Sequence, residues 1–440
     1  MVTLVYGLGE SGISATRALL LDNQAVRVAD AGDDDRLQRT LRELGVEGAL
    51  GAGPEVLDGS DRVVVSPGIR PGDPVLRSAE ERGMPVVSEV GLGLQLLGRS
   101  GVRVAAVTGT NGKTTVVDML HRMLDGVPHA VAGNSWRALT GCLDEVREAG
   151  LLLLEVSSFQ LHYLEGPGFD VAALLNARPD HLNWHASFEE YARDKLRVFE
   201  GQGPQDLALV SARDPVGLGV SDDLAAEVLV VGQGETAVRG GRLSLRGQEI
   251  ASEPELRFAG RHNLENALFA GVAAERLGAS VEEIRAGLLG YRLKPHRMEV
   301  VAERAGVLYV DDSKATNPAA VAAALTSFDA PVVLILGGSE KETDFAEVLP
   351  HLERCRAVVC QGEAGPGIFD YLRAAGCGDA CRLVAGLREA VAEAASLARE
   401  GDVVLLSPGC ASFDQFAGYA ERGEEFSRLV AELTGSGVRR

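Results

Sequence analysis

The sequence lacks a long hydrophobic run and an excess of positive charge, and each absence excludes a class of partner. No apolar stretch in its 440 residues reaches the roughly 18 that a membrane-spanning helix needs. A net charge of −20 opposes nonspecific binding to nucleic acid or to an anionic membrane. The N-terminus also lacks the basic flank and the long apolar stretch of a secretory leader. We therefore predict a cytoplasmic protein that binds neither nucleic acid nor membrane.

The six cysteines lack the spacing of a zinc site. None stands in a C-x-x-C pair with a partner pair at metal-binding spacing. Cys355 and Cys360 flank the apolar segment Ala357–Val359, so packing explains them better than a metal does. Reduced and mostly buried thiols fit a cytosolic compartment.

The composition, with 46% hydrophobic and 24% charged residues, is that of an ordinary folded protein. At ~150 residues per domain, the length predicts three domains. A Gly/Ser-rich break at Gly98–Gly101 and a hinge at Lys294–Arg297, where Pro295 disfavours helix, separate them. We place the domains at 1–96, 97–293 and 294–440.

Strand and helix patterns alternate along the chain, which predicts an α/β fold with largely parallel sheets. The first and last domains are expected to be Rossmann-like and the central one to be a P-loop mononucleotide-binding domain. Helices are expected near 12–22 and 35–44, and short polar strands within 205–255. The clearest strands are expected at Thr3–Tyr6, Ala25–Ala29, Arg62–Val65, Val102–Val107, Leu151–Leu154, Val171–Leu175, Val307–Val310, Val332–Leu336, Arg356–Cys360 and Val403–Leu406.

The first glycine-rich loop is compatible with several ligands. Gly7, Gly9 and Gly12 follow a strand and open a helix, and Asp30 ends the next strand. This spacing is the dinucleotide fingerprint, in which small residues let backbone N–H groups approach a diphosphate. NAD and UDP both satisfy that chemistry, and a tight turn without a ligand satisfies the spacing. Taken alone, the loop favours an oxidoreductase.

The second glycine-rich loop, Thr108–Thr115, has the character of a triphosphate site. It follows the apolar strand Val104–Val107 and opens an amphipathic helix. Lys113 adds a positive charge to the N–H groups of the loop, and Thr114 offers a hydroxyl to Mg²⁺. The generic P-loop spacing fails by one residue, because Val107 stands where its first glycine is required.

Two further residues place charge near that loop. Glu155 ends the strand Leu151–Leu154, where a carboxylate can hold the Mg²⁺ of a nucleotide, although a solvated strand end has the same sequence. Ser187 and Glu190 predict a capping box. Lys195 then falls on the apolar face of the capped helix, either as a snorkelling side chain or as a desolvated amine with a lowered pKa.

These motifs together resemble the Mur ligase family, and the similarity spans nearly the whole chain. The resemblance rests on Thr108–Thr115, Glu155 and the segment Asp180–His185. Three stretches are similar to the D-glutamate-adding branch of the family, namely Ser157–Leu161, Asp312–Pro318 and Ser407–Phe416. The D-N-P-R-like motif expected of the diaminopimelate- or lysine-adding branch is not found in the last domain.

The resemblance implies an ATP-dependent amide ligase of peptidoglycan precursor synthesis. Its small-molecule substrates would be UDP-N-acetylmuramoyl-L-alanine and D-glutamate, joined through an acyl phosphate, and the protein would be a monomer. The expected catalytic residues are Lys113, Glu155, His181 and Lys195. Two Mg²⁺ ions would be held by Thr114, Glu155, His181 and Lys195, the last as a carbamylated lysine. ATP would be bound by Gly109, Thr110, Asn111, Gly112, Lys113, Thr114, Thr115, Asn263, Asn266, Arg297 and Asp312.

The resemblance also implies residues for the other two substrates. The UDP-substrate would contact Glu10, Ser11, Asp30, Ser66, Pro67, Gly68, Asn134, Gln160 and His181. D-glutamate would contact Lys314, Thr316, Lys341, Ser412, Phe413 and Tyr419. Its two carboxylates require several donors, which suits the two lysines, and Asn317 followed by Pro318 predicts a helix start beside Thr316.

Several residues depart from the family pattern without removing a charge needed for phosphoryl transfer. Trp136 stands where a small residue is usual, Ala31 offers no hydroxyl, and Tyr419 replaces a phenylalanine. Asn183 and Trp184 alter the usual Asp-His-Leu-Asp-Arg-His run.

Three competing functions explain less of the sequence. An NAD-dependent dehydrogenase uses the first loop but leaves 108–115 and 312–316 without a role. Folylpolyglutamate synthase has the same fold but lacks the N-terminal UDP domain. A nucleotide sensor without activity is disfavoured because Lys113, Glu155, His181 and Lys195 are all present.

Overall fold

The computed structural model divides into two compact units, each described here by itself. Unit 1 comprises Met1–Glu255 and Glu265–Gly290, and unit 2 comprises Leu256–Leu264 and Tyr291–Arg440. The structure describes residues 1–51, 53–98, 101–164, 168–182, 184–258, 260–328, 330–339 and 345–434. None of the helices in these ranges has both the length and the apolar composition needed to cross a membrane.

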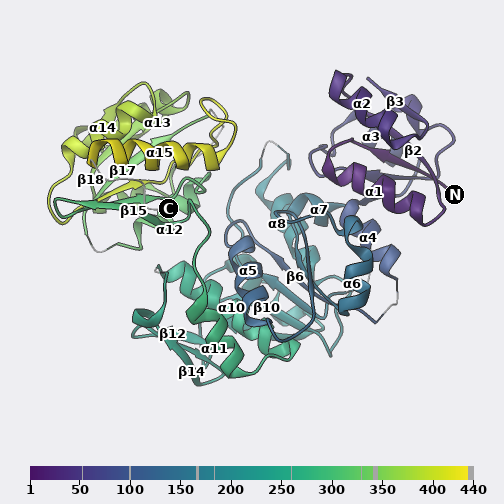
Figure 1. Ribbon diagram of the computed structural model, residues 1–440, viewed down its shortest axis with the longest axis horizontal. Helices are drawn as coiled ribbons and strands as arrows, with labels where there is room; N and C mark the ends of the chain where they lie inside the picture. The colour runs from purple at the N-terminus through teal and green to yellow at the C-terminus, as the bar shows by residue number, and fades with distance from the viewer. Residues whose placement is uncertain are drawn as a thin grey trace. The chain divides into compact units, whose positions relative to one another are not determined.

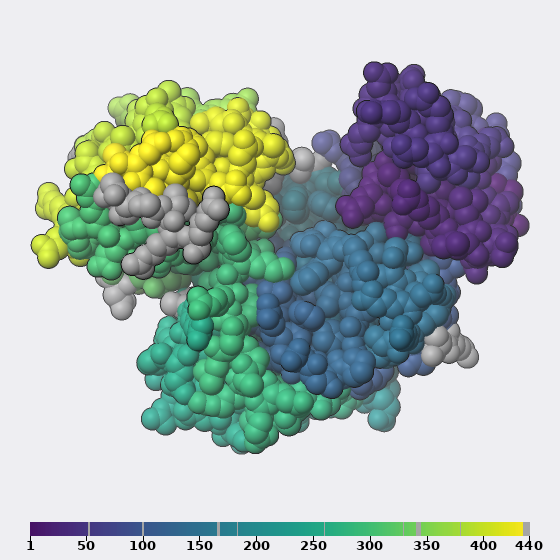
Figure 2. Space-filling model, in the orientation of Figure 1, coloured from purple at the N-terminus to yellow at the C-terminus, as the bar shows by residue number. Residues whose placement is uncertain are grey.

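The first sheet of unit 1 is parallel, with the order β3-β2-β1-β4-β5. Alternate residues of its strands pack on opposite faces: Leu4 and Val63 belong to one hydrophobic core, and Val5 and Val64 to the other. The elements around this sheet, which lie within residues 2–97, are coloured purple in Figure 2. The elements are β1 (Val2–Tyr6), α1 (Glu10–Leu21), β2 (Ala25–Asp30), α2 (Asp35–Leu44), β3 (Gly48–Leu50), β4 (Arg62–Val65), α3 (Pro74–Glu81), β5 (Val86–Ser88) and α4 (Glu89–Leu97).

The second sheet of unit 1 is also parallel, with the order β11-β10-β9-β6-β8-β7. Its central strand β6 lies between β8 and β9, so the loop after β6 lies beside the ends of both neighbours. The elements are β6 (Arg103–Thr108), α5 (Lys113–Met123), β7 (Ala130–Gly133), α6 (Leu143–Ala149), β8 (Leu151–Glu155), α7 (Ser158–His162), β9 (Val171–Leu174), α8 (Phe188–Leu196), β10 (Leu207–Ser211), α9 (Pro215–Leu218) and β11 (Glu227–Val231).

The predicted region of short strands, 205–255, is divided between two sheets. Its first two strands, β10 and β11, extend the parallel sheet. The others, β12 (Ala237–Arg239), β13 (Arg242–Leu245) and β14 (Gln248–Ser252), form a small antiparallel sheet. The helices α10 (Arg261–Leu277) and α11 (Val281–Gly290) follow (Figure 1).

A buried contact joins α1 and α4, two helices of the first domain, to the turn Leu139–Gly141 between β7 and α6. Glu89, at the start of α4, is 1% exposed, and its Oε1 accepts hydrogen bonds from the backbone N–H and the hydroxyl of Thr140, each at 2.6 Å. The Thr140 hydroxyl also lies 2.9 Å from the hydroxyl of Ser14 on α1. Burial raises the pKa of Glu89, although its hydrogen bonds to Thr140 oppose that rise.

Unit 2 contains a sheet with the order β15-β16-β20-β17-β18-β19. The pair β15–β16 is antiparallel and the other pairs are parallel, so the predicted α/β fold with largely parallel sheets is confirmed. The elements are β15 (Glu299–Arg304), β16 (Val307–Asp311), α12 (Pro318–Leu325), β17 (Val332–Gly337), β18 (Cys355–Gln361), α13 (Gly365–Ala374), β19 (Cys381–Leu383), α14 (Leu387–Leu397), β20 (Val403–Leu406) and α15 (Tyr419–Thr434).

Candidate active site

The loop between β6 and α5 presents a helix N-terminus and a lysine together. Gly112 has φ +90° and precedes the first helical residue, Lys113. A side chain at Gly112 would meet the Asn266 amide oxygen at 2.6 Å, so Asn266 of α10 lies against the loop. The Lys113 ammonium donates to the carbonyls of Gly109 and Thr110 at 2.8 and 3.1 Å. Such a combination of helix N-terminus and cation attracts phosphate.

Asn176, which the sequence analysis missed, fixes the shape of this loop. It lies two residues after the end of β9. Its side-chain carboxamide accepts from the Asn111 N–H at 2.9 Å and donates to the Asn111 carbonyl at 3.2 Å. Its own carbonyl accepts from the Thr110 N–H at 2.8 Å. The only sequence signal is a polar residue immediately after an apolar strand.

Glu155 is completely buried at the end of β8, yet it carries a carboxylate. Within the part of the chain that the structure describes, this carboxylate forms no ion pair. Its Oε1 and Oε2 accept instead from neutral donors: Thr114 Oγ1 at 3.2 Å, Asn134 Nδ2 at 3.0 Å, Ser135 Oγ at 2.9 Å and Trp136 Nε1 at 3.1 Å. A buried carboxylate without a counter-charge beside a phosphate-binding loop fits a hard divalent cation such as Mg²⁺.

Lys195 is buried on α8, with 1% exposure, so the snorkelling alternative is wrong. Burial and then the charge of Lys113 hold the pKa of its ammonium well below the usual value, while three aspartates including Asp180 oppose this. The Lys195 Nζ lies 4.5 Å from the centroid of the Tyr191 ring. The Tyr191 hydroxyl in turn hydrogen-bonds the Thr110 hydroxyl of the loop at 2.9 Å. Tyr191 therefore connects Lys195 to the same loop.

His181 adopts φ +55°, and its backbone N–H donates to the Asp180 carboxylate at 2.8 Å. Its ring contacts Phe159 edge to face, with 4.9 Å between centroids, and lies 6.4 Å from the Tyr191 ring. Tyr191 thus lies close to both Lys195 and His181. The neighbouring Asn183 is outside the described residues.

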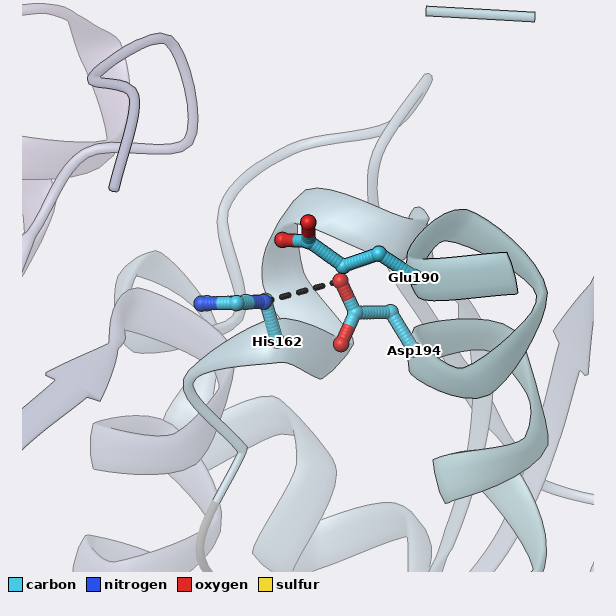
Figure 3. A group of neighbouring side chains, drawn as sticks. All are labelled: His162, Glu190 and Asp194. Carbon is cyan, nitrogen blue, oxygen red and sulfur yellow. Dashed lines mark hydrogen bonds and ion pairs between the residues drawn. The ribbon is translucent and has the colours of Figure 1, made fainter. Parts of the chain in front are cut away.

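The helix that carries Lys195 is fixed to α7 by Asp194 (Figure 3). The Asp194 carboxylate lies 2.8 Å from His162 Nδ1 and 3.1 Å from His185 Nδ1. Burial alone would raise its pKa, but these histidines hold the pKa of Asp194 below its usual value. His162, Glu190 and Asp194 together have side chains of the types that bind metals. The Glu190 carboxylate, however, already accepts a hydrogen bond from the Ala186 N–H at 3.0 Å. Hydrogen bonding therefore accounts for the position of each member.

A cavity of about 830 Å³ opens at the carboxyl ends of β1, β2 and β4. All six residues predicted there for the UDP-substrate line it: Glu10, Ser11, Asp30, Ser66, Pro67 and Gly68. The Asp30 carboxylate accepts from the backbone N–H groups of Leu8 and Gly32 at 2.7 and 2.8 Å, so it shapes the loop. The sequence analysis missed two cations of the lining, Arg70 and Arg77.

The three other residues predicted for the UDP-substrate do not belong to the lining of this cavity. Asn134 lies against Glu155, as described above. The Gln160 side chain is buried, and its Oε1 accepts from the Ser157 N–H at 2.9 Å in a capping box of α7. His181 lies beside Phe159, one residue before Gln160. The structure thus groups these three around the end of β8 and α7.

In unit 2, the described D-glutamate candidates come from three places. Lys314 and Thr316 lie between β16 and α12, Ser412 and Phe413 lie between β20 and α15, and Tyr419 begins α15. The Lys314 Nζ stands 4.0 Å from the centroid of the Tyr419 ring, a cation–π contact. Ser412 is buried, Thr316 is partly buried, and Phe413 is 75% exposed. Asn317 caps α12 by accepting from the Ala320 N–H, with Pro318 as first helical residue, as predicted. Lys341 lies outside the described residues.

Arg422, which the sequence analysis missed, joins the loop between β16 and α12 to the loop between β20 and α15. It is 1% exposed and donates to the carbonyls of Ser313, Cys410 and Ala411 at 2.9 to 3.0 Å. Burial lowers the pKa of its guanidinium to about 10.

The two ATP residues predicted in the third domain are near each other in unit 2. Asp312 is buried and accepts from the Ser407 hydroxyl at 2.9 Å. Burial raises the pKa of Asp312 to about 7, and the charge of Arg297 opposes that rise. The remaining predicted residue, Asn263, is buried on α10.

Comparison with sequence families covers most of the chain. The family described as "Mur ligase MurD-like, N-terminal domain" matches residues 1–88, "Mur ligase middle domain" matches 107–274, and "Mur ligase, glutamate ligase domain" matches 296–410.

Two relatives match almost from end to end. A protein of Rubrobacter xylanophilus named UDP-N-acetylmuramoylalanine--D-glutamate ligase is 70% identical over 97% of this chain and 98% of its own length. A protein of the same name from Pelotomaculum thermopropionicum is 37% identical, over 98% of this chain and 97% of its own.

Solved structures share the fold at low identity. MurF of Acinetobacter baumannii is 18% identical, with a TM-score of 0.61 over 94% of this chain and 91% of its own. A pseudomurein peptide ligase type C from Methanothermus fervidus is 17% identical, with a TM-score of 0.59 over 98% of this chain and 99% of its own.

Proposed function

The chain belongs to the Mur ligase family, and from that premise we propose that it is an ATP-dependent ligase that joins D-glutamate to UDP-N-acetylmuramoyl-L-alanine in peptidoglycan precursor synthesis. The observation that carries the proposal is the 70% identity, over 97% of the chain, to a relative named for this reaction. The buried Glu155 supports it, since this carboxylate fits a divalent cation and lies beside the loop between β6 and α5, called the Lys113 loop below. Phosphoryl transfer needs a cation and a phosphate-binding turn close together.

The proposed reaction has two steps. The alanyl carboxylate attacks the γ-phosphorus of ATP, and the bond to the bridging oxygen breaks to release ADP and an acyl phosphate. The amine of D-glutamate then attacks the acyl carbon, and phosphate leaves as the amide forms. The chain mainly holds the reactants and neutralises charge, through the Lys113 ammonium and the N–H groups at the start of α5.

The metal and the lysine would act together in this site. Mg²⁺, held by Thr114, Glu155, His181 and Lys195, would neutralise the phosphate oxygens when bound. Because burial disfavours the charged amine of Lys195, a neutral amine is available to take up CO₂ as a carbamate. The resulting anion is compatible with a cation site, whereas an ammonium would repel the metal.

We assign the other substrates to the predicted residues in each domain. Residues 1–96 would hold the UDP group in the cavity of the first sheet, with Arg70 and Arg77 facing the diphosphate charge. Residues 97–293 would bind ATP through the Lys113 loop, Asn263 and Asn266. Residues 294–440 would add Arg297 and Asp312 for ATP, and Lys314, Thr316, Lys341, Ser412, Phe413 and Tyr419 for D-glutamate.

An ADP-release assay tests the reaction. The protein is supplied with ATP, Mg²⁺ and UDP-N-acetylmuramoyl-L-alanine, and the amino acid is varied. ADP should form only with D-glutamate, and equal turnover with D-aspartate, L-lysine or diaminopimelate would refute the assignment.

Calorimetry of the intact chain tests the first cavity. Heat should appear on adding the UDP-sugar and be absent with NAD or NADP. Micromolar binding of NAD would favour the dehydrogenase reading of the first loop instead.

A further inference from the structure

The segment Gly133–Arg137, which begins at the last residue of β7, is folded tightly against the end of β8. Gly133 has φ +108°, and a side chain there would collide with the Glu155 carbonyl oxygen at 2.0 Å. The Asn134 N–H donates to that same carbonyl at 2.9 Å, and the Trp136 N–H closes the turn on the Gly133 carbonyl at 2.9 Å. The backbone of this segment is therefore positioned relative to Glu155 before any side chain is considered.

The two carboxylate oxygens of Glu155 accept hydrogen bonds from different side chains. Oε1 accepts from Asn134, Ser135 and also Thr114, which belongs to the first turn of α5. Oε2 accepts from the Trp136 indole N–H at 3.1 Å. The oxygen that faces the phosphate-binding helix is thus Oε1, and the indole holds the other one.

We propose that Trp136 is a positioning residue for the metal of the proposed function, on which this inference rests. Its indole N–H fixes the plane of the Glu155 carboxylate, so that Oε1 is presented beside the Thr114 hydroxyl. A donor on Oε2 remains compatible with a cation on Oε1, whereas the donors on Oε1 compete with that cation for the same lone pairs. Trp136 is partly buried while Asn134 and Ser135 are exposed, so water competes least with its hydrogen bond.

The expected size of the effect follows from other metal sites. Hydrogen-bond partners that orient a metal ligand typically change metal affinity by about 10- to 100-fold when removed. Trp136→Phe keeps an aromatic ring but removes the donor, and Trp136→His keeps a ring N–H. If the Trp136 ring serves only for packing, Trp136→Phe should lose no metal affinity and Trp136→His should bind the metal no more tightly than Trp136→Phe.

Mn²⁺ binding gives a readout that does not depend on turnover. The full chain is incubated with the β,γ-imido analogue of ATP and no muramoyl substrate, and free Mn²⁺ is measured by electron paramagnetic resonance. Trp136→Phe should bind Mn²⁺ about 10- to 100-fold more weakly than the wild-type protein, and Trp136→His should bind more tightly than Trp136→Phe. Trp184→Phe is the matched control, because it removes the second of the two tryptophans and should leave the Mn²⁺ affinity unchanged.

The same control supplies an optical test. In Trp184→Phe the tryptophan emission comes from Trp136 alone, and it should change as Mg²⁺ is added with the nucleotide analogue. Equal Mn²⁺ affinity in the wild-type protein and in folded Trp136→Phe overturns the inference alone. No Mn²⁺ binding by the wild-type protein overturns the proposed function as well. If Trp136→Phe does not fold, Trp136→Met serves as the donor-free variant with the same two outcomes.

Discussion

Both parallel sheets of unit 1 place a glycine-rich turn between a buried strand and a helix, at Gly7–Gly12 and at Thr108–Lys113. In each turn a glycine has a positive φ, +97° at Gly7 and +90° at Gly112. The first turn is shaped by a carboxylate, since both oxygens of Asp30 accept from backbone N–H groups. The second is shaped by a neutral carboxamide, Asn176, and is covered by a lysine.

This difference shows that the backbone of such a turn favours the binding of an anion, but that the side chains around it decide which anion binds. Both turns offer space and a helix N-terminus, which suit a phosphate group. The second turn adds Lys113 and has Glu155 and Lys195 nearby, which fits the proposed phosphoryl transfer. The first turn has Arg70 and Arg77 in the lining of its cavity, which fits the proposed binding of the UDP group without a chemical step.

The largest effect is expected when the positive charge of Lys113, which belongs to the second turn, is removed. Lys113→Ala should lower the rate of ADP release by roughly 10²- to 10³-fold, the usual loss when one group that stabilises transition-state charge is removed. Calorimetric affinity for the UDP-substrate should stay unchanged, because that cavity belongs to the other sheet. A parallel loss of both would show that the two turns do not act independently.

A somewhat smaller effect is expected at Lys195, which has no counterpart at the first turn. Lys195→Ala should lose activity by roughly 10²-fold if a carbamate assists the metal, while the fold survives. Small carboxylic acids should restore part of the turnover by occupying the vacated anionic position. Near-normal activity of Lys195→Ala, measured by ADP release, would leave the lysine with a packing role only.

A pair of glycines tests the packing of the first turn. In Gly12→Ala the new Cβ would lie 1.8 Å from the Gly7 carbonyl oxygen, whereas no atom lies within 4 Å of the position at Gly9. Overpacking of this kind costs about 1–3 kcal/mol of unfolding free energy, so Gly12→Ala should unfold at lower urea than the wild type. Gly9→Ala should retain stability and lose only affinity for the UDP-substrate. Equal stability of the two variants would contradict the packing argument.

A pH-dependent effect extends the comparison to the turn between β16 and α12 in unit 2. Asp312 in this turn has its pKa raised by burial from 3.8 to about 7. The folded state therefore holds its proton more tightly, and its contribution to stability falls as pH rises from about 4 to about 7. Urea unfolding across that range should show a flatter pH dependence in Asp312→Asn. An unchanged dependence would assign the titration to another group.

Regular elements could be predicted from the sequence because their patterns are local. The strand Arg62–Val65 and the helix at 35–44 have the expected bounds. The cap at Ser187 is confirmed, but the Glu190 side chain accepts from the Ala186 N–H, one residue earlier than a capping box requires. The antiparallel strand β15 was not predicted.

The missed contacts of the candidate site join segments that are distant in sequence. Arg422 bonds to Ser313, 109 residues away, and Asn176 to Asn111, 65 residues away. The hydrophobic periodicity of a sequence indicates local elements and gives no information about contacts between residues so far apart in the chain. Lys195 illustrates the same limit, since its place on the apolar face allowed both snorkelling and burial, and only the packing of α8 decides between them.

The contact between Glu89 and Thr140 bears on how this chain can be recombined with its relatives. The matched N-terminal family segment ends at residue 88, immediately before this buried carboxyl group. A chimaera that exchanges residues 1–88 alone would keep both Glu89 and Thr140 but replace Ser14, the third member of the contact. A graft that keeps all three partners of this contact therefore transfers α1, α4 and the Thr140 segment together.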